Sequence, residues 1–166
     1  MGNKVEIGTP APGFSLPSGD GHQVSLSDFK GKKNVVLYFY PADESRGCTA
    51  EACSFRDNYE AFTEAGAEVI GISSDSPESH RNFSAHHHLP FVLLSDEGKR
   101  VRDLYGVPSM LGLLPGRVTY VIDRNGIVKH IFNSQFQPAK HIEEALKVLK
   151  SIEGPLPIVE TRSPGI

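Results

Sequence analysis

The chain has 166 residues, of which 39% are hydrophobic and 22% are charged, and its formal net charge is −3. This length suits one compact domain that buries roughly two thirds of the surface its unfolded chain would expose. The slightly acidic balance argues against nucleic acid as a partner, and no apolar run approaches the roughly 20 residues that cross a membrane. Because the first ten residues (MGNKVEIGTP) lack the apolar core of a signal peptide, we expect an intracellular protein.

The chain contains only two cysteines, Cys48 and Cys53. Two are too few for a secreted scaffold built on several disulfides, and too few for a four-cysteine zinc site. Their C-x4-C spacing is therefore the feature of the sequence that most needs a functional explanation.

Signals for strands and helices alternate along the first half of the chain. Residues 10–22 are rich in Gly and Pro and predict an irregular arm, followed by a short strand near Val24–Leu26. The run Val35–Tyr40 is β-branched and aromatic without polar alternation, which predicts a strand buried on both faces at the centre of a sheet. Apolar residues then recur at steps of three and four and stop at Gly66, which predicts one amphipathic helix. The apolar positions of this helix are Ala52, Phe55, Tyr59 and Phe62.

The second half of the chain continues this alternation. It predicts strands at 67–73 and 91–94, helices at 77–88 and 99–105, a hairpin across the Asn-Gly turn at 124–126, and a last helix opened by Pro138. Strands separated by helices imply parallel pairing with right-handed crossovers. The order is that of an α/β, thioredoxin-like fold, with a central mixed β-sheet flanked by helices and an N-terminal extension. We expect one domain over residues 1–153 and a mobile tail over 154–166.

Cys48 lies where a buried strand gives way to the first turn of a helix, and sites in α/β sheets form at such strand ends. The helix dipole favours an anion there, but it typically supplies only about 0.3–1 kcal/mol. An ordinary thiol is about 3% ionised at pH 7, and reaching about 90% requires about 3.4 kcal/mol. A cation must therefore contribute, with Arg46 the nearby candidate and Arg117 the distant one. By spacing alone, both arginines would be expected on the surface.

Helical geometry separates the two cysteines. Cys48 shares the predicted apolar face, whereas Cys53 points about 140° away from the centre of that face. Residues five apart on a regular helix have Cα atoms roughly 8.6 Å apart, beyond the roughly 7 Å limit for a disulfide. If the two cysteines do join, the first turns of the helix must unwind. The residues alone leave a second interpretation open, in which both cysteines are small buried hydrophobes.

The segment Pro41-Ala42-Asp43-Glu44-Ser45-Arg46-Gly47-Cys48 resembles the peroxiredoxin pattern Pro-x-x-x-Thr/Ser-x-x-Cys. With Cys53 five residues later, the chain resembles the peroxiredoxin Q, or bacterioferritin comigratory protein, subgroup from about residue 5 to 152. Further motifs agree in order and spacing: Phe55-Arg56-Asp57, Gly71-Ile72-Ser73, Leu93-Leu94-Ser95-Asp96-Glu97-Gly98 and Pro115-Gly116-Arg117.

This resemblance implies a role for each matching residue. Cys48 would be the peroxidatic cysteine, oxidised to a sulfenic acid, and Cys53 the resolving cysteine that closes an intramolecular disulfide. Ser45 would hydrogen-bond the peroxide and the thiolate, Arg117 would polarise both, and Pro41 would shield the site from water.

Two positions depart from the family pattern. Ser45 stands where the family more often has Thr, so a methyl group that restricts the rotamer is missing. Arg46 stands where the subgroup usually has Pro, and we expect its charge to favour the thiolate form of Cys48.

The resemblance further implies a monomeric peroxidase without a cofactor, acting on hydrogen peroxide and organic hydroperoxides and recycled by thioredoxin, with glutaredoxin as the alternative reductant. A disulfide oxidoreductase is a weaker alternative because its usual C-x-x-C motif is absent. A non-catalytic redox sensor that uses the same disulfide stays open. We expect the compartment to be a bacterial cytoplasm, with a mature plastid form as the alternative.

The run His86-His87-His88 suggests a metal site at first sight. Consecutive helical residues point about 100° apart, so three histidines in a row cannot all bind one ion, and we expect a polar helix end without a metal. Residues 123–126 form a turn without a calcium loop, and no glycine-rich nucleotide motif occurs.

Overall fold

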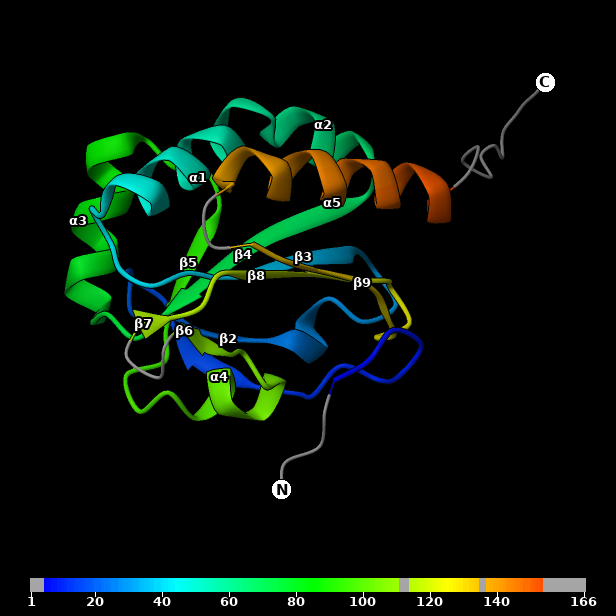
Figure 1. Cartoon of the computed structure of the whole chain (residues 1–166), viewed down its shortest axis with the longest axis horizontal. Helices are drawn as coiled ribbons and strands as arrows, with labels where there is room; N and C mark the ends of the chain where they lie inside the picture. The colour runs from blue at the N-terminus through cyan, green and yellow to red at the C-terminus, as the bar shows by residue number, and fades with distance from the viewer. Residues whose placement is uncertain (1–4, 111–113, 135–136, 154–166) are drawn as a thin grey trace.

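The structure is a computed structural model that describes residues 5–110, 114–134 and 137–153 (Figure 1). The tail expected over 154–166 lies outside the described residues. Within the described part, the strands of the central sheet run in the order β5-β4-β3-β8-β9. Their bounds are β3 Asn34–Phe39, β4 Ala67–Ser73, β5 Val92–Ser95, β8 Val118–Ile122 and β9 Val128–Asn133.

The remaining elements surround this sheet. The helices are α1 Arg46–Asp57, α2 Tyr59–Glu64, α3 Pro77–His87, α4 Arg100–Tyr105 and α5 Pro138–Glu153, with a short 3-10 helix at Leu26–Asp28. Two small antiparallel pairs are β1 Ser15–Pro17 with β2 Gln23–Ser25, and β6 Ser109–Met110 with β7 Leu114–Pro115.

Strand β3 is the centre of the sheet, as its unbroken apolar run predicts. All six of its residues are buried. It pairs in parallel with β4 and antiparallel with β8, and β4 pairs in parallel with β5. The Asn-Gly turn joins β8 to β9 in an antiparallel hairpin, where the Asp123 carboxylate accepts hydrogen bonds from the N–H groups of Asn125 and Ile127. The predicted mixed, thioredoxin-like sheet is confirmed.

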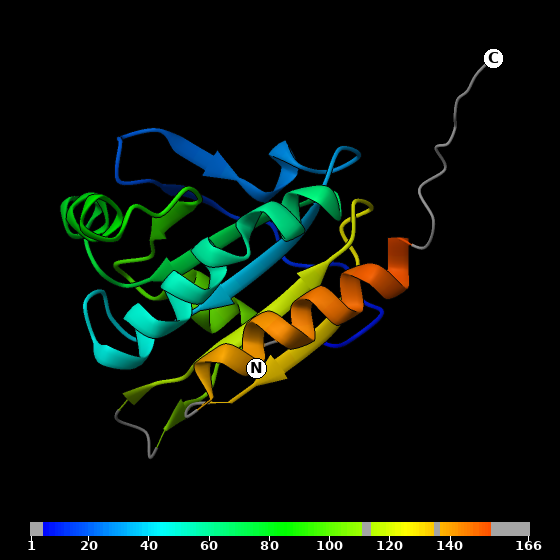
Figure 2. The ribbon, with the colours of Figure 1, turned by 90° about the horizontal axis from the view of Figure 1, so that it is seen from above.

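Side chains alternate between two cores on opposite faces of the sheet. Val35, Leu37 and Phe39 of β3 face a core that includes residues of α4 and of the β1-β2 pair. Val36, Tyr38 and Tyr40 face the other core, to which α1, α2, α3 and α5 contribute. Helices α1 and α5 lie side by side over that second face, as Figure 2 shows from above. Cys48 belongs to this second, helix-covered core.

Three details differ from the sequence-based expectations. The single helix predicted up to Gly66 is two helices, because the chain leaves helical geometry at Asn58, whose side-chain amide donates to the Ser54 carbonyl oxygen at 2.8 Å. The arm predicted as irregular over 10–22 contains β1, and the loop after Gly106 contains β6 and β7. Over the described residues, no helix combines the length and the apolar character that a membrane span requires.

Candidate active site

Cys48 is the third residue of α1, directly beyond the loop that leaves the centre of the sheet. Its side chain is 1% exposed and lies in the same core as Tyr38, Ala52 and Phe55. The helix begins after Ser45, whose backbone is extended and whose side chain does not cap the first turn. Because the first N–H groups of a helix lack intrahelical partners, they and the helix dipole favour a negative charge at this position.

Arg117 provides the buried cation that the charge of a thiolate requires. This residue precedes β8 and is 4% exposed, so the expectation from spacing that it lies on the surface is wrong. Its Nη1 donates to Glu51 Oε1 at 2.6 Å, and its guanidinium lies close enough to Cys48 to interact with it electrostatically. Burial alone would lower the pKa of Arg117, but Glu51 and Cys48 raise it above its usual value. The guanidinium is therefore charged where it meets the sulfur.

Gly47 allows this close approach. A Cβ atom added to Gly47 would lie 2.9 Å from Arg117 Nη2, which is closer than real Cβ contacts allow. A residue without a side chain directly before Cys48 thus lets the guanidinium lie against the first turn of α1. Arg46, the other candidate cation, is exposed at the start of that turn.

Glu51 lies one helical turn after Cys48 and is fully buried. Burial raises its pKa to about 8, although Arg117 beside it acts in the opposite direction. When Glu51 is protonated, it can still orient Arg117 through this hydrogen bond. When it is ionised, it forms a buried ion pair with the guanidinium at 2.6 Å.

His141 of α5 packs beside Glu51, on the side away from Arg117 Nη1. Its Nδ1 lies 2.8 Å from Thr119 Oγ1 and 3.6 Å from Glu51 Oε2, and its Nε2 lies 2.8 Å from the Ser134 carbonyl oxygen. Burial lowers the pKa of His141 to about 4. The ring is thus neutral, with Nε2–H donating to Ser134 and Nδ1 accepting from Thr119, so it adds no charge that competes with Arg117.

A second buried arginine, Arg102 of α4, connects the two segments that meet at the site. Its Nη2 donates to the Tyr40 carbonyl oxygen at 2.9 Å, and its Nη1 donates to the Gly116 carbonyl oxygen at 3.2 Å. Tyr40 directly precedes Pro41, and Gly116 directly precedes Arg117. Arg102 therefore fixes the loop before α1 relative to the segment that carries Arg117.

The loop between β3 and α1 is held by Asp43. Its carboxylate accepts hydrogen bonds from Tyr40 at 2.6 Å and from Ser79 at 2.7 Å, and lies 2.7 Å from His80 Nδ1. Burial alone would raise the pKa of Asp43, but the contacts with His80, Tyr40 and Ser79 hold it below its usual range. This anchored loop presents Pro41 and Ser45, which are both partly buried.

Ser45 has a contact that the family resemblance does not imply. Its hydroxyl donates to the Ala42 carbonyl oxygen at 3.0 Å. Because a hydroxyl has one proton to donate, Ser45 must rotate before it can donate a hydrogen bond to a thiolate or a peroxide. The family's Thr would resist that rotation more strongly, since its branched side chain restricts χ1.

Cys53 occupies a different face of α1, as the helical geometry predicts. Both cysteines are free thiols, with Cys48 buried and Cys53 partly exposed. Cys53 Sγ lies 4.0 Å from Nδ1 of His87 in α3. The structure therefore brings Arg117 to Cys48 but keeps Cys53 apart from both, and the expected separation of the two cysteines on a regular helix is confirmed.

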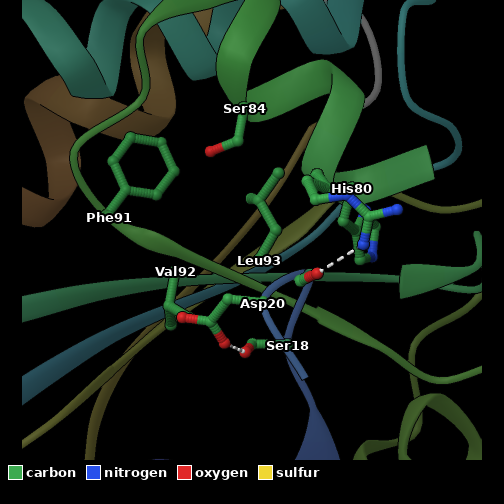
Figure 3. Close-up of a pocket in the computed structure, with 9 residues that line it drawn as sticks. Ser18, Asp20, His80, Ser84, Phe91, Val92 and Leu93 are labelled. Atoms are coloured by element: carbon green, nitrogen blue, oxygen red, sulfur yellow. Dashed lines mark hydrogen bonds between the residues drawn. The ribbon is translucent and has the colours of Figure 1, made fainter. Parts of the chain in front are cut away.

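Two surface pockets among the described residues lie away from Cys48. One of about 240 Å³ is bounded by the turn after β1, by α3 and by β5, and Figure 3 shows His80, Phe91 and Asp20 around it. Another of about 300 Å³ lies near Phe29 and Ile122. None of the predicted site residues lines either pocket.

Sequence reasoning missed Glu51, His141 and Arg102. One signal for Glu51 was available, since it lies three residues after Cys48 and next to Ala52 on the face predicted to be buried, where a charged residue needs a partner. His141 and Arg102 lie far from Cys48 in the sequence, and no local pattern marks them.

Comparisons with known proteins agree with this geometry. The sequence matches the AhpC/TSA family model over residues 7–131. It is 59% identical over 151 residues to a chloroplastic peroxiredoxin Q of Sedum lineare, covering 90% of this chain and 81% of that protein. The corresponding Arabidopsis thaliana protein is 58% identical over 149 residues, covering 89% of this chain and 68% of the relative.

Solved structures show the same architecture. Peroxidoxin BcpB of Mycobacterium tuberculosis superposes with a TM-score of 0.83 at 36% identity, covering 89% of this chain and 98% of its own. A bacterioferritin comigratory protein of Xanthomonas campestris, studied for its alkyl peroxide reduction activity, has a TM-score of 0.79 at 31% identity, with coverages of 89% and 97%.

Proposed function

The chain belongs to the AhpC/TSA family of peroxiredoxins, which includes the peroxiredoxin Q proteins, and on this premise we propose that it is a thiol peroxidase in which Cys48 reduces hydrogen peroxide and organic hydroperoxides. The observation that carries the proposal is the placement of the buried guanidinium of Arg117 against the first turn of α1, beside buried Cys48. A buried cation and a helix N-terminus at one sulfur favour the thiolate, which is the reactive form of cysteine.

In the first step, the Cys48 thiolate attacks the terminal oxygen of the hydroperoxide. The O–O bond breaks, an S–O bond forms, and the leaving alkoxide or hydroxide takes a proton to become alcohol or water. Arg117 can donate to the peroxide oxygens as negative charge moves from the sulfur to the leaving oxygen. The product on the enzyme is a sulfenic acid.

In the second step, Cys53 resolves the sulfenic acid. Its thiol displaces the oxygen of Cys48 as water and leaves an intramolecular disulfide. Because the two cysteines lie on different faces of α1, the first turns of the helix unwind before the sulfurs meet. The partial exposure of Cys53 supports this movement, since its displacement removes little from the core.

A dithiol reductant completes the cycle. We take thioredoxin as the donor and glutaredoxin as the alternative, since two electrons and two protons from a dithiol return both cysteines to thiols. Among the described residues, the large exposed hydrophobic side chains are Ile7 and Leu104, which supports a monomer. The chloroplastic relatives support the plastid form that stands as the alternative to a bacterial cytoplasm.

Turnover separates this function from a redox sensor with the same disulfide. In an assay with thioredoxin, its reductase and NADPH, catalytic amounts of the protein should consume many equivalents of peroxide. Consumption of a single equivalent per chain would favour the sensor and contradict the proposal.

Single variants test the two cysteines separately. Cys48→Ser should abolish peroxide consumption. Cys53→Ser should form one sulfenic acid per chain, detected by mass spectrometry, but should not recycle with thioredoxin. Full thioredoxin-linked turnover in Cys53→Ser would contradict the resolving role.

A further inference from the structure

A second polar cluster lies where the C-terminal end of α3 meets the loop before α1. The Glu44 carboxylate lies 2.9 Å from His86 Nδ1 and 3.1 Å from His87 Nε2. One ligand atom from each residue falls within 4.8 Å of the others. The peroxidase cycle uses none of these three side chains. We propose that Glu44, His86 and His87 form a binding site for a divalent transition-metal ion, of which Zn²⁺ is the best fit.

The donor set and its dimensions suit zinc. Zinc in proteins is bound by histidine nitrogens and carboxylate oxygens at about 2.0–2.2 Å in tetrahedral geometry, which places ligand atoms about 3.3 Å apart. The contacts run to different oxygens of the Glu44 carboxylate, Oε2 at 2.9 Å from His86 and Oε1 at 3.1 Å from His87. Since the three ligand atoms lie within 4.8 Å of one another, the side chains must draw together around the ion when it binds.

His87 is held in place for this role. Its ring packs edge-on against Phe83, with centroids 5.1 Å apart, and its carbonyl oxygen accepts a hydrogen bond from Arg56 at 2.8 Å. Its Nδ1 faces Cys53 Sγ at 4.0 Å, which leaves Nε2 directed at Glu44. A ligand side chain that is already fixed by packing and by hydrogen bonds loses little conformational entropy when an ion binds.

The other two ligands leave the site open to solvent. The side chains of His86 and Glu44 are 65% and 48% exposed, whereas that of His87 is 17% exposed. An ion can therefore arrive from the surface, and a water molecule can complete the tetrahedron as the fourth ligand.

The two histidines converge although they are consecutive in a helix. They present different nitrogens, Nδ1 close to the backbone in His86 and Nε2 at the far end of the ring in His87. The sequence pattern excludes one ion shared by all three histidines, and the structure brings only two to this point. His88 adopts left-handed geometry with φ 54° at the end of α3 and is not part of the cluster. The third ligand comes from Glu44, 42 positions upstream of His86.

The group formed by Asp43, Asp75 and His80 is a less suitable metal site, although its ligand atoms also lie close together. The side chains of His80 and Asp43 are 0% and 3% exposed. Their facing atoms already contact each other at 2.7 Å, and His80 Nε2 lies 2.9 Å from the Leu94 carbonyl oxygen. These contacts brace the loop before α1 and leave no open coordination position.

Metal binding is tested on the full chain with both thiols removed, so that the cysteines cannot bind the ion. In the Cys48→Ser/Cys53→Ser background, titration with Co²⁺ followed by visible absorption, and competition with Zn²⁺, should reveal one ion per chain. Glu44→Gln and His86→Ala should each weaken binding by about tenfold or more. The matched control His88→Asn, which tolerates left-handed geometry, should bind as the parent does.

Four results would overturn the proposal. The first is no saturable binding in the thiol-free background. The second is unchanged affinity in both Glu44→Gln and His86→Ala, with circular dichroism confirming that these variants are folded. The third is loss of binding in His88→Asn equal to that in His86→Ala. In the wild-type chain, a thiolate-to-cobalt charge-transfer band that disappears in Cys53→Ser would also contradict this ligand set.

Discussion

The two cysteines share one helix but lie in unlike surroundings. Cys48 is 1% exposed and is held by Arg117, which in turn contacts the buried carboxyl of Glu51. Cys53 is partly exposed and has the ring of His87 beside it at 4.0 Å. The proposed nucleophile, Cys48, is thus held by buried polar groups, whereas the proposed resolving residue, Cys53, lies at the partly exposed edge of the core.

This contrast suggests how oxidation starts the movement. In the proposed cycle, a Cys48 thiolate would attract the guanidinium of Arg117 and so hold the first turn of α1 in place. A sulfenic acid is neutral, so oxidation removes that attraction at the moment when Cys48 must move. Phe55, 0% exposed and stacked on Tyr38 with ring centroids 4.5 Å apart, keeps the following turn packed on the sheet.

The largest expected effect on the oxidation of Cys48 comes from removing the positive charge of Arg117. Arg117→Ala should slow oxidation of Cys48 by hydrogen peroxide by about 100-fold to 1,000-fold, the usual cost of losing a buried donor that stabilises developing charge. Stopped-flow measurement of sulfenic acid formation in the Cys53→Ser background checks this. Arg117→Lys keeps the charge but loses the forked geometry of the guanidinium, so its oxidation rate should lie between those of the parent and of Arg117→Ala. An oxidation rate within about threefold of the parent in Arg117→Ala would exclude the proposed role of Arg117.

A second prediction concerns the neutral state of Glu51 and the pH dependence of stability. Its folded-state pKa of about 8 lies above the unfolded value of 4.5, so its contribution to stability is complete below pH 4.5 and is lost as the pH rises toward 8. Glu51→Gln, which cannot ionise, should therefore gain stability relative to the parent between pH 5 and pH 8, on the order of a few kcal/mol.

Urea unfolding of both proteins at pH 5 and pH 8 measures this difference. A constant difference between Glu51→Gln and the parent at the two pH values would show that Glu51 is already ionised at pH 5. Glu51 would then share the positive charge of Arg117 with Cys48 even at pH 5, and the account of how Arg117 stabilises a Cys48 thiolate would have to change.

A third prediction concerns the unwinding of α1 that brings Cys53 to Cys48. Ala50 is exposed in the part of α1 that must unwind. Ala50→Gly weakens a helix by about 1 kcal/mol, so disulfide formation after peroxide addition should accelerate about fivefold, with little change in the rate of the first oxidation. The control Ala85→Gly makes the same change at an exposed position of α3 and should leave both rates unaltered. Equal rates of disulfide formation in Ala50→Gly and the parent would argue against unwinding as a slow step.

The smallest expected effect belongs to Arg46. It is exposed beside the first turn of α1, where a surface charge contributes about 0–1 kcal/mol. Arg46→Pro should lower the thiolate fraction of Cys48, seen as alkylation by iodoacetamide that is about two- to threefold slower in the Cys53→Ser background. An unchanged or faster alkylation rate would mean that Arg117 acts without help from Arg46.

Much of this arrangement follows from local patterns in the sequence. The apolar run of β3 predicts the centre of the sheet, and helical spacing places Cys48 on the buried face of α1 and Cys53 off it. These features depend on residues near one another in the chain, so the period of the side chains is sufficient to predict them.

The charges around Cys48 could not be predicted in this way. Spacing alone suggests that Arg117 is exposed; the charge of a thiolate made it only one of two candidate cations, and the family resemblance was needed to assign it to the site. The partner of Glu51 lies 66 positions away, and His141 reaches the group from α5. Such contacts arise from tertiary packing and leave no periodic signal. The convergence of Glu44 with two of three consecutive histidines was missed for the same reason.

The central claim is that α1 opens between the two cysteines when Cys48 is oxidised. Amide hydrogen exchange measured by mass spectrometry on the reduced protein and on the peroxide-treated protein tests it most directly. We predict that the segment from Cys48 to Cys53 loses protection when the disulfide forms, while β3 and β4 keep theirs. An α1 that remains fully protected in a protein whose Cys48–Cys53 disulfide is verified by mass spectrometry would contradict the account.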